Sequence, residues 1–100
     1  MAIVHGTDKN FKDLIKGKVI VDFFATWCGP WKMLAPVIEE ISSKYPNINF
    51  VKIDVDECPN VSKEYGIMSV PTLLKIENGE IIDSKIGYLN IKEFEKWICE

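Results

Sequence analysis

One segment constrains the fold more than any other: a long apolar run that leads into a cysteine, a glycine and a proline. Residues 19–25 read Val-Ile-Val-Asp-Phe-Phe-Ala, a length and composition typical of a buried strand. Pro30 favours the first turn of a helix, because a proline there gives up no intrahelical hydrogen bond. Cys28 is therefore expected where a strand passes into a helix, at the helix N-terminus.

This position suits a reactive sulfur. The first N–H groups of a helix have no intrahelical acceptor, and the helix dipole adds partial positive charge there. Both effects stabilise a thiolate, which is the nucleophilic form of cysteine, and Lys32 acts in the same direction. The alternative is a buried structural cysteine. Trp27, Gly29 and Pro30 around Cys28 fit an exposed corner and favour the reactive interpretation.

The composition indicates one slightly acidic domain with a sizeable core. The chain has 100 residues, of which 47% are hydrophobic, and a formal net charge of −3. This length predicts a single domain over residues 1–100, with a core that needs no disulfide or metal. Because the chain has no basic stripe, nucleic acid is not an expected partner. No apolar run approaches the ~20 residues that cross a bilayer, so no membrane partner is expected either.

The cysteine and histidine content argues against a metal centre. Cys28, Cys58 and Cys99 have no metal-type spacing, and the chain has only one histidine; no metal or other cofactor is therefore expected. We interpret Cys58 as a loop thiol and Cys99 as an incidental thiol of the final helix. Residues Met1–His5 lack the charged-then-apolar pattern of a signal peptide. A sparse, odd number of cysteines without that signal predicts a cytoplasmic protein.

Hydrophobic spacing predicts alternating helices and strands in the first half of the chain. A helix capped by Thr7 and Asp8 ends near Gly17, and a strand over 18–25 follows. A longer helix over 30–45 carries apolar residues at every third or fourth position. The residues expected to be buried on this helix are Met33, Leu34, Val37, Ile38 and Ile41.

The second half predicts strands joined by a hairpin and followed by a helix. Asn78-Gly79 is a strong signal for a two-residue hairpin turn, and Asn90 with Glu93 resembles a helix capping box. The order βαβαβαββα predicts an α/β fold in which helices cover both faces of a mixed sheet. The other predicted elements are a strand over 51–56, a short helix over 59–65, and strands over 72–76 and 81–86.

Asp22 interrupts the apolar strand and has two possible interpretations. A carboxylate buried without a partner is costly, and burial raises the pKa of an aspartate so that it exchanges a proton near neutral pH. The alternative is that Asp22 points outward from a strand of period two. The strand pattern alone leaves both interpretations open.

Several motifs in a fixed order make the chain resemble the thioredoxin family over essentially its whole length. The matching segments are residues 21–30 (Val-Asp-Phe-Phe-Ala-Thr-Trp-Cys-Gly-Pro), Lys32-Met33, Ala35-Pro36, Val55-Asp56, 65–67 (Tyr-Gly-Ile), 70–73 (Val-Pro-Thr-Leu) and Asn78-Gly79. The resemblance implies a thioredoxin fold with a five-stranded mixed sheet flanked by four helices. It also implies a protein that reduces protein disulfides and is recycled by a thioredoxin reductase, an enzyme that depends on flavin and NADPH.

The resemblance assigns roles to residues on both sides of the thiol. Cys28 matches the attacking cysteine, and Pro71 matches a proline whose preceding peptide bond is cis and which lies against that thiol. Ser69 and Val70 would offer backbone groups to a bound peptide, as an added strand does. Gly87 matches a glycine that lets substrate backbone approach the groove.

The resemblance also favours the buried interpretation of Asp22. It makes Asp22 the acid behind the active site, with Lys52 beside it, and together they would handle a proton. Trp27 is interpreted both as an aromatic anchor and as a substrate-facing residue, and Gly29 and Pro30 would shape the same docking groove.

Trp31 is the departure from the family pattern, because a C-x-x-C motif would have its second cysteine there. A residue three places along a helix is within disulfide reach of Cys28. Trp31 has no thiol, so it cannot resolve a mixed disulfide with substrate. Its indole is also larger than a cysteine side chain, and we expect it to turn outward or to push the helix start aside. Whether position 31 is natural or altered is left open.

Two functions from different classes remain. The first is a thiol–disulfide oxidoreductase in which Cys28 attacks disulfides, turnover is impaired and mixed disulfides persist. The second is a non-catalytic binding module that uses the groove around Trp27, Trp31 and Pro71. An iron–sulfur carrier is a weak third hypothesis, since it would need a glutathione site for which the sequence gives no signal.

Overall fold

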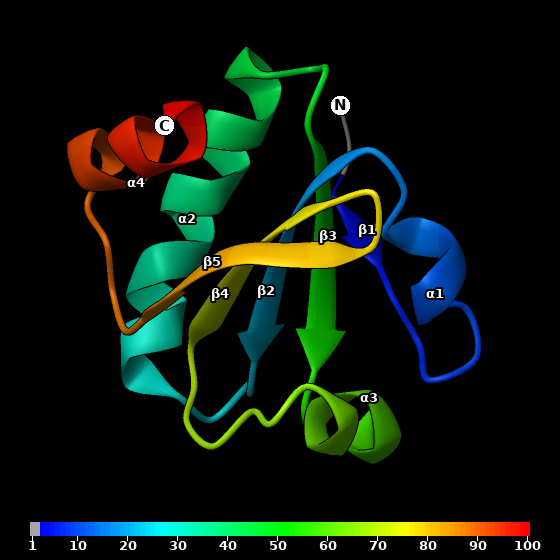
Figure 1. Cartoon of the computed structure of the whole chain (residues 1–100). Helices are drawn as coiled ribbons and strands as arrows, with labels where there is room; N and C mark the ends of the chain where they lie inside the picture. Colours follow the sequence, from blue (N-terminus) through cyan, green and yellow to red (C-terminus); the bar gives the residue numbers. More distant parts are fainter. Residues whose placement is uncertain (1–2) are drawn as a thin grey trace.

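Five strands form one mixed sheet with helices on both faces (Figure 1). The strand order is β1-β3-β2-β4-β5, in which β1, β3 and β2 run parallel and β4 and β5 are antiparallel to their neighbours. The elements are β1 (Val4–His5), α1 (Phe11–Leu14), β2 (Lys18–Phe24), α2 (Gly29–Lys44), β3 (Asn49–Asp54), α3 (Pro59–Glu64), β4 (Thr72–Glu77), β5 (Glu80–Ile86) and α4 (Ile91–Cys99). The predicted element order and the predicted five-stranded α/β fold with four helices are confirmed.

The computed structural model describes residues 3–100. Met1 and Ala2 belong to the segment that was tested for a signal peptide, and they lie outside the described residues.

Two hydrophobic clusters fill the space between the sheet and its helices. One cluster joins α1 and α3 to one face through residues such as Phe11 and Val61. The other joins α2 and α4 to the opposite face through residues such as Leu34 and Phe94. Because β2 lies at the centre of the sheet, its side chains contribute to both clusters, with Val21 on one face and Ile20 on the other. The end of this strand is therefore a rigid platform for whatever follows it.

The hairpin-turn signal at Asn78-Gly79 and the capping-box signal at Asn90 and Glu93 are confirmed. Asn78 and Gly79 connect β4 to β5 and both have positive φ, at 51° and 85°, the backbone conformation that the favoured two-residue hairpin turn requires. Asn90 and Glu93 form a reciprocal capping box at the start of α4. These two local signals fix the route of the chain after β4, because they place both the reversal and the final helix.

The predicted cap of the first helix is wrong, because the N-cap residue of α1 is Asn10, whose side chain makes no capping hydrogen bond. Asp8 does not cap α1; its carboxylate instead accepts the backbone N–H of Val61, at 2.9 Å, at the start of α3. Thr7 accepts hydrogen bonds from the N–H groups of Lys9 and Asn10 just before α1. The unsatisfied N–H groups at the start of α3 thus receive their acceptor from a segment about 50 residues away, which no local pattern could indicate.

The predicted burial of Met33 is also wrong, because its side chain is 63% exposed. Leu34, Val37, Ile38 and Ile41 are buried as predicted. Each residue advances ~100° around a helix, so Met33 lies beyond the edge of the face that these four residues form. The apolar stripe of α2 is therefore narrower at its start than the spacing suggested.

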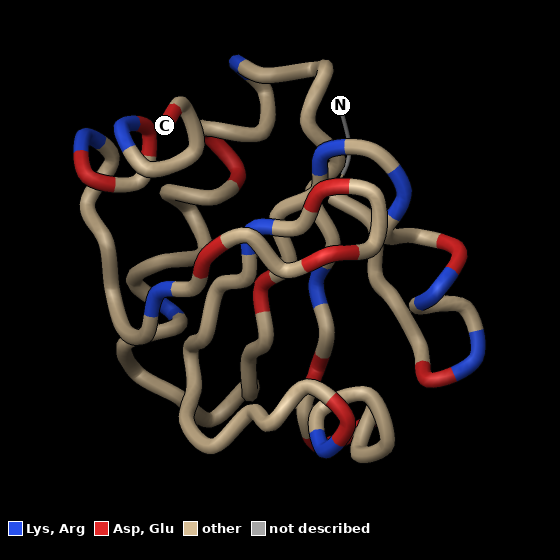
Figure 2. The backbone as a smooth tube through the Cα atoms, viewed as in Figure 1, with Lys and Arg blue, Asp and Glu red and all other residues tan. Residues whose placement is uncertain are grey.

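Charged residues of both signs are interspersed along most of the chain (Figure 2). Within residues 3–100, no helix has the length and apolar character needed to cross a membrane.

Candidate functional site

Cys28 is the N-cap residue of α2, directly beyond the end of β2. Its backbone is extended, with φ −84° and ψ 117°, and its carbonyl accepts the N–H of Lys32 at 3.2 Å. The side chain is only 5% exposed. Because α2 has 16 residues, its dipole is fully developed, and the sulfur lies at the positive end of that dipole. The expected strand-to-helix position of the thiol is confirmed.

The loop before β4 lies against this sulfur. The Sγ of Cys28 is 3.5 Å from the backbone carbonyl of Val70. The Val70–Pro71 peptide bond is cis, as the resemblance implied, and Pro71 is buried. The carbonyl of Pro71 accepts the N–H of Gly87 at 2.9 Å. The start of α2 and the segment before β4 thus meet at this thiol, and the end of β5 is joined to Pro71 of that segment.

A shallow groove of about 380 Å³ lies on this side of the molecule. Trp27 and Met68 are its most exposed apolar residues, at 67% and 93% exposure. The groove is lined by Trp27, Val55, Ile67, Met68, Ser69 and Val70. An open, mostly apolar hollow beside an extended segment is suited to a peptide rather than to a small polar ligand.

The remaining predicted docking residues lie around the groove without lining it. Gly29 and Pro30 are exposed in the first turn of α2. Gly87 is half-buried with a φ of 93°, a conformation that favours glycine. The carbonyl of Ser69 already accepts the hydroxyl of Thr72, at 2.6 Å. Of the six residues expected to bind substrate, Trp27, Ser69 and Val70 are those that the groove brings together.

Asp22 is buried, with 1% of its surface exposed. One carboxylate oxygen, Oδ2, accepts the indole N–H of Trp31 at 2.9 Å. The other, Oδ1, is buried without a hydrogen-bond partner among the described residues. Lys52 is the register partner of Asp22 on β3. Burial raises the pKa of Asp22 to about 6, although the Trp31 hydrogen bond and the Lys52 charge both act to lower it. Of the two interpretations of Asp22, the buried one is correct.

One expectation was that the indole of Trp31 would turn outward. This expectation is wrong, because the side chain is half-buried. Its ring stacks on Phe24 with the centroids 4.4 Å apart and the planes 20° apart. The Nζ of Lys52 lies 4.8 Å from the centroid of the same ring. The indole therefore folds back over the end of β2, where the buried carboxylate of Asp22 offers it an acceptor. Because the acid six residues before Cys28 is buried, this conformation is favourable for a donor side chain.

The other two thiols lie in different surroundings. Cys58 is 3% exposed and precedes α3, where its sulfur lies 3.6 Å from the carbonyl of Gly6. Burial raises the pKa of Cys58. Cys99 is the last residue of α4, is exposed, and lies 3.5 Å from the hydroxyl of Tyr45. All three cysteines are free thiols, and the structure places Cys58 in a loop and Cys99 on the final helix, as predicted.

Sequence reasoning missed three residues that shape the site. The carboxylate of Asp56 accepts the indole N–H of Trp27 at 2.9 Å, Phe24 supplies the ring on which Trp31 stacks, and Met68 forms the exposed edge of the groove. Asp56 and Phe24 followed the alternation of their strands and gave no separate signal. Met68 had one, because it is a large apolar residue in a loop next to Pro71. Among the described residues, no cluster of His, Cys, Asp and Glu could hold a metal.

Comparisons with known proteins agree with this geometry. The thioredoxin family model matches residues 2–100. Thioredoxin of Staphylococcus saprophyticus is 49% identical over 90 residues, which cover 88% of this chain and 86% of that protein. Thioredoxin of Bacillus subtilis is 46% identical with the same coverage. Among solved structures, oxidised mitochondrial thioredoxin 3 of Saccharomyces cerevisiae superimposes with a TM-score of 0.88 at 39% identity, covering 97% of this chain and 93% of that one.

Proposed function

The chain belongs to the thioredoxin family of thiol–disulfide oxidoreductases, and on that premise we propose that Cys28 alone performs the exchange. The thiolate of Cys28 attacks one sulfur of a protein disulfide. A new disulfide forms between Cys28 and that sulfur, and the other substrate sulfur leaves as a thiolate. The observation that carries the proposal is the single thiol at the start of α2, opposite the carbonyl of Val70.

The second step needs a thiol that this chain does not offer at position 31. In a dithiol cycle the residue three places after the attacking cysteine would release the substrate. Trp31 carries an indole that is bonded to Asp22, so the mixed disulfide on Cys28 persists until an outside thiol attacks it. The thiolate of such a thiol, for example glutathione, attacks Sγ of Cys28, so the reduced substrate leaves and a Cys28–glutathione disulfide forms. A second glutathione then frees Cys28 and leaves as glutathione disulfide. We therefore propose a protein with slow turnover and long-lived covalent intermediates.

The partners follow from the family and from the groove. Proteins that carry a disulfide are the proposed substrates, with an extended segment lying along Trp27, Ser69 and Val70. Asp22 and Lys52 are the proposed proton-handling pair behind the site, and Pro71 with Gly29, Pro30 and Gly87 completes its walls. A thioredoxin reductase is a further proposed partner, because the family is recycled by such an enzyme. A reducing compartment such as the cytoplasm is proposed from the three free thiols.

A single-turnover experiment tests this function. The reduced protein is mixed with insulin, and the products are separated and weighed by mass spectrometry. We expect a covalent complex with insulin, attached at Cys28, that remains until glutathione is added. Repeated turnover at the rate of a dithiol thioredoxin, without an added thiol, would contradict the proposal.

One observation favours a second function. The exposed apolar side chains of Trp27 and Met68 form a surface that could hold a partner without any covalent step. The variant Cys28→Ser separates the two functions. A binding module keeps its partner in this variant, whereas an oxidoreductase loses its covalent intermediate.

A further inference from the structure

The first turn of α2 has few contacts with the rest of the molecule. Of residues 29–33, four are exposed: Gly29, Pro30, Lys32 and Met33. Trp31 is half-buried and is the exception. The next residue of the helix that enters the core is Leu34, six residues after Cys28, which is more than one and a half turns by helix geometry. Any fixed orientation of this turn relative to the sheet must therefore come largely from Trp31 and from Cys28 itself.

Three contacts from two neighbouring strands hold the indole of Trp31. Its Nε1–H donates to Oδ2 of Asp22 at 2.9 Å, and its ring stacks on Phe24, two residues later on β2. The Nζ of Lys52 on β3 lies near both rings, 4.8 Å from the Trp31 centroid and 5.0 Å from the Phe24 centroid. A hydrogen bond to a buried carboxylate is stronger than one between neutral groups.

Trp27 and Trp31 thus bracket the sulfur in the sequence, and each donates its indole N–H to an aspartate at 2.9 Å. Trp27 reaches Asp56, beyond the end of β3, and is 67% exposed. Trp31 reaches Asp22, which is 1% exposed. The Trp31 contact is the less accessible of the two. Trp31 belongs to α2, whereas Trp27 precedes that helix.

We propose that Trp31 is a positioning residue for Cys28. Its indole fastens the first turn of α2 to β2, and this keeps the free N–H groups of the helix aligned on the sulfur. The inference deepens the proposed function, because it takes Cys28 as the reacting thiol. An indole N–H donates but does not accept, so Trp31 relays no proton. In this chain, Oδ2 of Asp22 serves as an anchor.

The charged and titratable groups around this contact come from several elements. Lys52 faces the indole from β3, and the hollow beside it is also lined by His5 of β1, by Asp54 of β3 and by Glu57 before α3. The Trp31 hydrogen bond lowers the pKa of Asp22 against the effect of burial. Loss of the bond must therefore raise that pKa above about 6, which gives a readout independent of the thiol.

The variant Trp31→Phe tests the proposal, because it keeps an aromatic ring and removes the N–H. The rate constant for alkylation of Cys28 by iodoacetamide is measured at neutral pH, with the site identified by mass spectrometry. We expect a roughly three- to tenfold decrease, the range that corresponds to one net hydrogen bond. Hydrogen exchange at residues 29–32 should become faster, and carboxyl NMR should show a raised pKa for Asp22.

Trp97→Phe is the matched control. Trp97 also donates its indole N–H to an aspartate, Asp83, at 2.9 Å, but it lies on α4. We expect alkylation of Cys28 to be unchanged in this variant. Asp22→Leu removes the acceptor instead of the donor, and combined with Trp31→Phe it should slow alkylation no more than either change alone.

The proposal is overturned if the rate constant for alkylation of Cys28 in Trp31→Phe is within twofold of that in the parent protein. It is also overturned if Trp97→Phe lowers this rate constant as much as Trp31→Phe does. Additive effects of Asp22→Leu and Trp31→Phe in the double variant would overturn it as well. Alkylation needs no disulfide substrate. A normal alkylation pattern together with an absence of mixed disulfides would reject the proposed function while leaving the role of Trp31 intact.

Discussion

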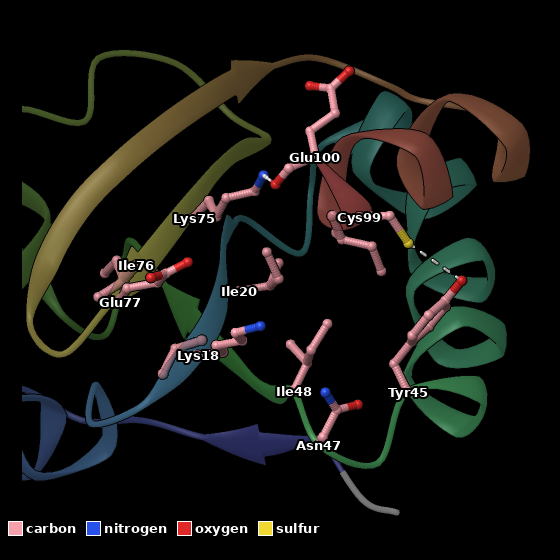
Figure 3. A pocket seen from close by; sticks show the side chains of 12 residues that line it. Lys18, Ile20, Tyr45, Asn47, Ile48, Lys75, Ile76, Glu77, Cys99 and Glu100 are labelled. Carbon is pink, nitrogen blue, oxygen red and sulfur yellow. Dashed lines mark hydrogen bonds between the residues drawn. The ribbon is translucent and has the colours of Figure 1, made fainter.

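Two cysteines lie at opposite ends of the sheet, and their surroundings differ in helix polarity, burial and neighbours. Cys28 begins α2 beyond the end of β2, whereas Cys99 ends α4 near the start of β2. Cys99 lines a cavity of about 250 Å³. Figure 3 shows Lys18, Tyr45 and Lys75 among the other residues that line it. Cys28 is 5% exposed and Cys99 is exposed.

The difference separates two features that could decide which thiol reacts, namely exposure and position at a helix end. A helix N-terminus stabilises negative charge and a helix C-terminus opposes it. Cys99 also lies beside a phenol that donates its hydrogen to the carboxylate of Glu95, at 2.5 Å; this hydrogen bond raises the pKa of Tyr45. The more exposed thiol is thus in the less favourable place for a thiolate.

Removing each of the two sulfurs in turn should give the largest difference between the two ends, in the formation of a mixed disulfide. In Cys28→Ser we expect no mixed disulfide with insulin, because the attacking atom is absent. In Cys99→Ser we expect the complex to form as in the parent protein. The products are compared by mass spectrometry under identical conditions. A complex that survives Cys28→Ser and disappears in Cys99→Ser would reverse the assignment of the two ends.

Trp31→Cys should sharpen the comparison, because it adds a second thiol at only one end. An internal thiol attacks the mixed disulfide at high effective concentration, so multiple turnover should rise by at least roughly tenfold. The rate of insulin reduction with dithiothreitol as electron source measures the gain. If this variant turns over no faster than the parent protein, the account of the defect at position 31 is wrong.

The end of the sheet that carries Cys28 also buries the carboxyl group of Asp22. The variant Asp22→Asn measures what this group contributes to the free energy of unfolding. The pKa of Asp22 is about 6 in the folded protein, against 3.8 for an unperturbed aspartate. The native state therefore binds more protons between pH 4 and 6, and its stability falls as pH rises through that interval. Above pH 6 the variant, which has no charge to bury, should be more stable by about 2 kcal/mol, after a discount for its unpaired amide.

Chemical denaturation of the parent and of Asp22→Asn at pH 4, 6 and 8 tests this expectation. The advantage of the variant should be present at pH 8 and should disappear toward pH 4. A difference in stability that does not change with pH would show that the buried carboxyl is not the source.

Tyr45→Phe should give the smallest effect and should be confined to the far end. It removes the hydroxyl that joins Cys99 to Glu95, which costs about 1 kcal/mol of stability or less for a partly exposed hydrogen bond. Urea denaturation measures this cost, and alkylation of Cys28 should be unaffected. A change in the reactivity of Cys28 would mean that the two ends are coupled.

The fold followed from local signals that act over a few residues. The apolar run before Cys28, the Asn78-Gly79 turn and the Asn90 capping box each specify their own structure, and all three are present as predicted. The departures arose where a side chain finds a partner far along the chain. Asp8 caps α3 rather than α1, and a sequence pattern contains no distance between such segments.

The position of Cys28 was predictable from the sequence, but the contacts around it were not. The order strand, cysteine, glycine, proline predicted a thiol at the start of a helix, where the structure has it. The conformation of Trp31 was not predictable, because bulk alone suggested that the indole would turn outward. Its orientation depends on an acceptor, Asp22, that becomes available only when the strand is buried in the sheet. The hydrogen bond to Asp22, the stacking on Phe24 and the nearby Lys52 together favour the folded-back conformation of the indole.

Competitive alkylation at neutral pH tests the central claim most directly. The folded protein receives less iodoacetamide than its total thiol, and the label on each cysteine is quantified by mass spectrometry after digestion. The account predicts that Cys28 carries most of the label in spite of its low exposure, with Cys99 second and the buried Cys58 last. Label that accumulates first on Cys99 would show that accessibility, and not the helix N-terminus, decides which sulfur of this protein reacts.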